Sequence, residues 1–124
     1  MKLAYVDTSC LVVIAFAEQD HEALTGELMD FDRLFSSNLA EAELRSAFRR
    51  ERVEEPEGLL SALTWVFPNR PLTDEYREIL SRGYICGADL FHLGCALFLR
   101  RELENLAFVS VDQPQLAIAR SLGM

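Results

Sequence analysis

The sequence predicts a three-layer α/β/α domain in which a short parallel sheet is flanked by helices. Apolar, strand-like runs alternate with longer helical segments along the whole chain. No two of these runs are joined by the tight turn of a β-hairpin. Parallel strands need crossover connections, which are usually helices, so this alternation favours a parallel sheet covered on both faces.

The length and composition bound the class of protein. The chain has 124 residues, half of them hydrophobic, which predicts one domain over residues 1–124 with a core of its own. The longest apolar run, residues 10–17, is far shorter than the roughly 20 residues that a membrane span needs. It follows an aspartate rather than a basic leader. We therefore expect a soluble, cytoplasmic protein without a signal peptide or a membrane segment.

The cysteines predict neither a disulfide nor a zinc site. They are odd in number, lie in apolar segments and lack the pair spacing of zinc ligands. We expect reduced, buried thiols at all three positions. The three positions are Cys10, Cys86 and Cys95.

The charge balance is acidic, with 12 basic against 20 acidic residues and a net charge of −8. This balance argues against a protein that holds nucleic acid by bulk electrostatics alone. Carboxylates gathered in one cleft bind divalent cations, however, and those cations supply the positive charge that a phosphate backbone needs. The composition is therefore compatible with metal-dependent phosphodiester chemistry.

The chain opens on an apolar run over residues 2–6, which predicts a buried strand that ends at Asp7. Thr8 or Ser9 is expected to cap the next helix, which is apolar on nearly all sides and runs to about residue 17. An amphipathic helix is predicted over about residues 20–29. In an open α/β sheet, ligands bind where strands end and helices begin, so Asp7 is a candidate functional residue.

A second strand is predicted around residues 33–36, followed by a helix from residue 39 to about residue 52. Asn38 is its expected N-cap, and Glu41 has the spacing that completes a capping box. Glu43 has no such structural role and lies on a different face from an arginine row, which makes it a candidate functional carboxylate. The arginines either hold an RNA backbone or face solvent. They are Arg45, Arg49, Arg50 and Arg52.

The second half of the chain alternates in the same way. A helix is predicted from Pro56 to about residue 63, then a short or edge strand over residues 65–68, since Pro68 cannot donate to a central ladder. Helices follow at about 74–81 and 88–101, a strand at 106–111, and a terminal helix from Asp112 to about residue 122. Parallel strands end at one edge, so Asp112 and Asp7 should lie on a common rim.

Asp89 lies near the start of the most apolar predicted helix, where almost no other side chain is polar. An unpaired carboxylate there would cost on the order of several kcal/mol. Either the amide groups of its own helix N-terminus compensate the charge or a bound cation does, and the apolar surroundings favour the cation. His92, one turn later, is expected in the core or behind a functional residue, and not as the catalytic base.

Four carboxylates are therefore expected to converge on one rim. Each alone has an ordinary explanation, as a residue at a helix start or on a solvated face. Their convergence indicates a cation site, and ligands that are all oxygen suit Mg²⁺ or Mn²⁺ rather than zinc. The four are Asp7, Glu43, Asp89 and Asp112.

Four short motifs, in their order and spacing, resemble the PIN-domain nucleases, and most of all the toxin ribonucleases of VapBC-type toxin–antitoxin pairs. They are Val6–Ser9, Ala42–Leu44, Ala88–Leu93 and Phe108–Asp112. The resemblance implies a Rossmann-like α/β/α fold and an acidic site for Mg²⁺ or Mn²⁺. The residues carried over are Asp7, Glu43, Asp89 and Asp112, with Thr8, Ser9 and Ser110 as polar neighbours.

The chain departs from the family pattern at two places near these motifs. Gly94 and Cys95 stand where the family often has a threonine, and Val111 stands where an asparagine commonly precedes the last aspartate. These differences bear on a second metal ion more than on the fold.

The resulting hypothesis is a metal-dependent endoribonuclease that acts as the toxin of a toxin–antitoxin pair. Asp7 and Asp89 would hold a cation that lowers the pKa of a water molecule, and Glu43 and Asp112 would orient that water or hold a second ion. The resemblance implies RNA as substrate and a small antitoxin protein as partner. The hydrophobic excess fits a homodimer.

Two other functions remain to be separated from this one. The first is a catalytically weak or inactive PIN-like module whose acidic groove docks the arginines of a partner protein. The second is a phosphatase with Asp7 as covalent nucleophile, which is disfavoured because residue 9 is a serine and not a second aspartate.

Overall fold

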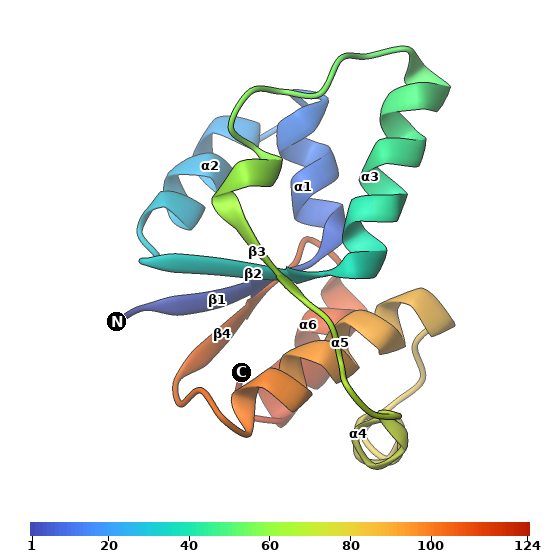
Figure 1. Ribbon diagram of the computed structural model, residues 1–124. Helices are drawn as coiled ribbons and strands as arrows, with labels where there is room; N and C mark the ends of the chain where they lie inside the picture. Colours follow the sequence, from blue (N-terminus) through green and yellow to red (C-terminus); the bar gives the residue numbers. More distant parts are fainter.

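The computed structural model describes residues 1–124 and contains one four-stranded parallel sheet with helices on both faces (Figure 1). The central strand β1 (Leu3–Val6) pairs with β2 (Arg33–Ser37) on one side and with β4 (Leu106–Val109) on the other. The strand β3 (Leu63–Val66) pairs with β2 and forms an edge, so the order is β3-β2-β1-β4. The predicted three-layer architecture and the edge position of the third strand are confirmed.

Three helices cover each face of the sheet (Figure 1). The first face carries α1 (Thr8–Ala15), α2 (His21–Met29) and α3 (Asn38–Glu51). The second carries α4 (Thr73–Leu80), α5 (Gly87–Arg100) and α6 (Gln113–Ser121). None of these helices is both long and apolar enough to cross a lipid bilayer.

Side-chain alternation along β1 divides the core between the two faces. Ala4 and Val6 pack with α1, α2 and α3, whereas Leu3 and Tyr5 pack with residues of α4, α5 and α6. All four β1 residues are buried, which is why the strand is apolar throughout and does not alternate with polar residues. The ladder continues past Val6, because the Asp7 amide donates to the Val109 carbonyl at 2.9 Å. The sheet thus fixes the backbone of Asp7.

Two predicted helix caps are wrong by one residue. Asp7, and not Thr8 or Ser9, is the N-cap of α1, and its carboxylate accepts the Ser9 amide at 3.1 Å. Ser37 caps α3 in place of Asn38, because β2 runs directly into the helix and the serine hydroxyl reaches the Ala40 amide.

The predicted capping box of α3 is absent for the same reason. With the start of the helix moved back by one residue, Glu41 no longer has the spacing to reach the cap. Its carboxylate accepts a hydrogen bond from the Arg45 guanidinium at 3.0 Å instead.

The segment after α3 departs most from prediction. The helix expected from Pro56 to residue 63 is a single 3₁₀ turn, Leu60–Ala62, because Gly58 has a φ of +82° and breaks any regular helix there. The strand β3 consequently begins at Leu63, two residues earlier than predicted. At the other end of the chain β4 stops at Val109, because the chain leaves the ladder to place Ser110 and the residues after it at the rim.

The cysteine prediction holds at two positions of three. Cys10 and Cys95 are buried, and burial raises the pKa of each thiol to about 12. Cys86 is exposed, because it precedes α5 as the N-cap and lies outside the packed part of that helix.

Candidate functional site

Asp7 stands at the end of the central strand and is almost completely buried, with 3% of its surface exposed. Both of its carboxylate oxygens accept hydrogen bonds. Oδ2 accepts the Ser9 amide at 3.1 Å, and Oδ1 accepts the side-chain amide of Gln115 at 3.2 Å. Two N–H donors therefore hold a buried carboxylate in one orientation.

Gln115 joins Asp7 to two other predicted site residues. Its Nε2 also donates to the backbone carbonyl of Asp89 at 3.2 Å, and its backbone amide donates to Asp112 Oδ1 at 3.0 Å. Its Oε1 accepts the hydroxyl of Ser110 at 2.7 Å. The side chain is fully buried. Through Gln115, helix α6 therefore links the residues of the site to one another.

The sequence reasoning missed Gln115, although a signal was present. Gln115 shares a helical face with Ile118 and Ala119, which are both buried. A glutamine at a buried position of an amphipathic helix must satisfy its amide internally, and that requirement marks it as part of a polar network.

Asp89 lies in the first turn of α5 and is half-buried. The thiol of Cys86 donates to its Oδ2 at 3.1 Å, and no protein group donates to Oδ1. The helix N-terminus and one thiol therefore compensate part of the charge, and one carboxylate oxygen remains available to a ligand.

Glu43 is held from behind by His92. Its Oε1 lies 2.8 Å from His92 Nε2 and accepts the Thr8 hydroxyl at 2.9 Å. The bond to His92, followed by the bond to Thr8, lowers the pKa of Glu43 below its ordinary value. Glu43 therefore remains a carboxylate at neutral pH.

His92 is fully buried and connects Glu43 to the core. Its Nδ1 lies 2.9 Å from the Tyr5 hydroxyl and 3.3 Å from the Ser37 hydroxyl. A carboxylate can only accept, so this arrangement fits the tautomer with the proton on Nε2, directed at Glu43. The expectation that His92 lies in the core is confirmed, and these contacts place it behind Glu43.

The remaining predicted residues border Asp7. Thr8 Oγ1 lies 3.0 Å from His92 Nε2 in addition to its bond to Glu43, and the hydroxyls of Ser9 and Ser110 are 3.3 Å apart. Asp112 is the N-cap of α6, which is the ordinary structural role of a residue at a helix start. Its Oδ2 accepts no hydrogen bond from the protein.

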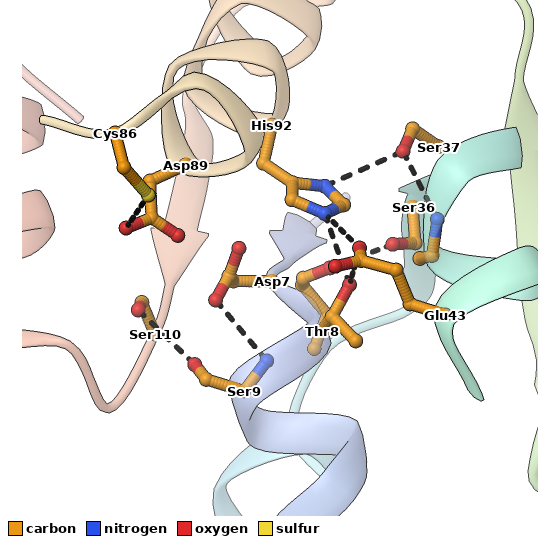
Figure 2. A network of polar contacts seen from close by, with 12 residues as sticks. Asp7, Thr8, Ser9, Ser36, Ser37, Glu43, Cys86, Asp89, His92 and Ser110 are labelled. Carbon is orange, nitrogen blue, oxygen red and sulfur yellow. Dashed lines mark hydrogen bonds and ion pairs between the residues drawn. The ribbon is translucent and has the colours of Figure 1, made fainter. Parts of the chain in front are cut away.

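The predicted residues form two connected groups on either side of Asp7 (Figure 2). On one side Gln115 links Asp7 with Asp89 and Asp112. On the other side lies Glu43, joined to Thr8 and His92. No three His, Cys, Asp or Glu side chains are arranged around one point as a ready-made metal centre.

Comparison with known protein families shows which family the chain belongs to. A family model described as PIN domain matches residues 4–121. The chain belongs to the PIN-domain family. Neither the curated proteins nor the solved structures include a significant match to the chain. PIN domains are typically nucleases that act on nucleic acids with the help of divalent metal ions, so the family assigns nuclease-type activity to this fold.

The free carboxylate oxygens of this PIN domain are ligands of the type that a hard divalent cation prefers. These oxygens form no hydrogen bond with the protein and come from different elements. No histidine nitrogen points toward them. Magnesium keeps several water ligands and usually takes one or two carboxylates, so a site of this type does not require three carboxylates in place beforehand. Those oxygens are Asp89 Oδ1, Asp112 Oδ2 and Glu43 Oε2.

Proposed function

We propose that this PIN-domain protein is a Mg²⁺- or Mn²⁺-dependent endoribonuclease and the toxin component of a toxin–antitoxin pair. The observation that carries the proposal is the link that the Gln115 side chain forms between Asp7 and Asp89. Gln115 Nε2 lies 3.2 Å both from Asp7 Oδ1 and from the Asp89 carbonyl, at the end of the central strand. Two carboxylate-bearing residues from distant elements are thereby held together where parallel sheets bind ligands.

The proposed roles follow from these contacts. Asp7 and Asp89 would hold the cation, with Asp7 kept in place by its two N–H donors. Asp112, which accepts the backbone amide of Gln115, would hold a second ion or orient water. When bound, the cation would lower the pKa of water and offset charge on the non-bridging phosphate oxygens.

Glu43 would orient the attacking water or hold a second ion through its free Oε2. The lowered pKa keeps its carboxylate ionised at neutral pH, and the contacts with His92 and Thr8 direct it. Thr8, Ser9 and Ser110 would support the carboxylates as polar neighbours.

The same proposal includes two protein partners and a location. A small antitoxin would insert a basic segment against the acidic rim, and the protein would form a homodimer in the cytoplasm. Several apolar side chains are exposed, among them Tyr84 at 86% and Leu80 at 45%, which supports burial of part of this surface by a partner. Sedimentation of the purified protein as a monomer, with no co-purifying small protein, would contradict both partners.

A second function keeps the fold without the cleavage. Asp7 and Asp112 already serve as helix N-caps, and this observation favours a module whose acidic groove only docks arginines of a partner. Such a module would bind its partner without any response to divalent cations.

The test is the hydrolysis of single-stranded RNA by the purified protein with Mg²⁺, with Mn²⁺ and with EDTA. We expect cleavage only with metal, and a loss of at least about a hundred-fold in the Asp7→Asn variant, because the cation loses a charged ligand. Asp74→Asn is the matched control, since Asp74 lies exposed on α4. Cleavage that survives both EDTA and Asp7→Asn contradicts the proposal.

A further inference from the structure

A pocket of about 430 Å³ lies beside the acidic rim, between the start of α3, the segment after β3, and α5. In Figure 1 this segment leaves β3, passes α5 and leads to α4. We propose that the pocket binds one nucleobase of the RNA substrate, adjacent to the phosphate at the carboxylates. The inference rests on the proposed function and specifies how the substrate is held. The lining includes Asn38, Phe67, Pro68, Arg70, Tyr76 and Phe91.

The pocket and the carboxylate site share a wall. Ser37 and His92 face the site, where the Ser37 hydroxyl lies 3.3 Å from His92 Nδ1. Their chain neighbours Asn38 and Phe91 line the pocket, and the rings of Phe91 and His92 meet edge to face with centroids 6.2 Å apart. His92 in turn contacts Glu43. A nucleotide with its phosphate at the carboxylates therefore has its base within reach of this pocket.

The apolar lining suits the face of a base. Phe67 directly follows the edge strand β3 and exposes 65% of its surface, although a phenylalanine is normally buried. Phe91 and Tyr76 add two further aromatic side chains to the same lining. Single-stranded RNA is held mainly by the stacking of its splayed bases on aromatic side chains.

Two polar groups in the pocket suit the edge of a base. The side-chain amide of Asn38 and the hydroxyl of Tyr76 form no hydrogen bond within the protein, and neither is a buried unsatisfied group. An amide presents both a donor and an acceptor, and can therefore pair with a base edge. A pocket for an aliphatic side chain would have no use for these groups.

The walls of the pocket are fixed in advance. Arg70 is bonded to the fully buried carboxylate of Glu75 by two hydrogen bonds of 2.9 and 2.8 Å, which anchors the turn after Phe67. Gly94 permits the close approach of Tyr76, since a Cβ there would lie 2.7 Å from the ring. A rigid pocket loses less entropy when it binds, and this favours a small planar ligand.

The experiment measures the binding of four homopolymeric twelve-nucleotide RNAs by fluorescence anisotropy at one fixed salt concentration, with Ca²⁺ in place of Mg²⁺ so that the carboxylates keep a divalent cation. We expect Phe67→Ala to weaken binding of all four by at least about five-fold, because stacking does not depend on base identity. Asn38→Ala is expected to reduce the differences in affinity among the four RNAs. Met29→Ala is the control, because Met29 is also an exposed apolar residue, at 79%, and lies at the C-terminal end of α2.

An abasic scan locates the contact. In the wild type, removal of the base at one position of the RNA should weaken binding about as much as Phe67→Ala does, and in Phe67→Ala the same removal should have no further effect. Equal affinities of Phe67→Ala and wild type, or no RNA binding by the wild type, would overturn the inference.

The outcome also separates this inference from the proposed function. Binding that depends on Phe67 without any metal-dependent cleavage contradicts the nuclease and leaves the base pocket in place. Metal-dependent cleavage with normal binding by Phe67→Ala contradicts only the pocket.

Discussion

His92 is the residue that connects the acidic rim to the core. It is 1% exposed, and both ring nitrogens have polar partners: Tyr5 and Ser37 at Nδ1, and Thr8 and Glu43 at Nε2. A buried ring with this many contacts has one orientation available to it. The position of Glu43 therefore depends on packing beneath the site.

We predict that replacement of His92 causes a large loss of stability. We expect His92→Ala to lower the free energy of unfolding by about 2–4 kcal/mol, because it leaves a cavity and removes the partner of several buried hydroxyls. Urea denaturation at pH 7 measures the change. His21→Ala, at the more exposed start of α2, should change the stability by less than about 0.5 kcal/mol. A loss below 1 kcal/mol for His92→Ala would show that the network carries little energy.

The element that holds the second face together is α4. Its Glu75 is fully buried and accepts hydrogen bonds from Arg70, in the segment after β3, and from Arg101, at the end of α5. The bonds from Arg70, with a backbone hydrogen bond and the charge of Arg101, lower the pKa of Glu75 to about 2 against the opposing effect of desolvation. One carboxylate thus joins three segments of the chain.

The depressed pKa predicts a stability difference that depends on pH. A carboxyl group whose pKa is lower in the folded state stabilises the protein fully above its unfolded pKa, near 4.5. That stabilisation is lost as the pH falls towards about 2.

We therefore expect Glu75→Gln to be less stable than wild type by about 1–2 kcal/mol at pH 7, a value reduced because both arginines are half-exposed. The difference should shrink steadily below pH 4.5 in urea denaturation. Glu78→Gln is the control, because its contact with Arg101 is long, at 3.8 Å, and exposed. A difference that is constant from pH 7 to pH 3 would contradict the ion-pair explanation.

In the whole molecule, the parallel sheet determines where the residues of the site lie. Asp7 follows β1, Ser110 and Asp112 follow β4, Glu43 lies in the helix after β2, and Asp89 lies at the start of α5. These elements approach one edge because every strand runs in the same direction. The chain carries a net charge of −8, and Figure 2 shows the carboxylates of Asp7, Glu43 and Asp89 in this one region.

Binding of a cation at this rim should therefore stabilise the entire fold. We expect Mn²⁺ to raise the melting temperature of wild type, with a stabilisation of about 2.7 kcal/mol at one hundred times the Kd. The shift should be much smaller in Asp7→Asn and in Asp89→Asn, and unchanged in Asp74→Asn. Differential scanning calorimetry, with each variant compared with its own metal-free form, provides the measurement. No shift in any of the four proteins would indicate a docking groove without a cation site, and equal shifts in all four would show that Mn²⁺ binds away from Asp7 and Asp89.

Local sequence pattern was enough to predict most of the secondary structure and the direction of the strands. Strand-like and helical periodicity located β1, β2, β4 and all six α-helices to within a few residues, and the lack of hairpin turns indicated a parallel sheet. Once the strands are parallel, their ends share an edge, so Asp7 and Asp112 could be placed on one rim. Turn chemistry was less informative: the αL conformation of Gly58 replaced the helix expected after Pro56.

The contacts between distant side chains, in contrast, depend on how the elements pack together. Gln115 lies 108 residues from Asp7, and His92 lies 49 residues from Glu43, so no local pattern predicts either hydrogen bond. The same is true of the pocket, whose lining comes from three distant segments. Periodicity identifies the buried face of each element, but the register between packed elements selects the partners of a buried polar group. That register follows from side-chain packing and from the need to satisfy every buried donor and acceptor.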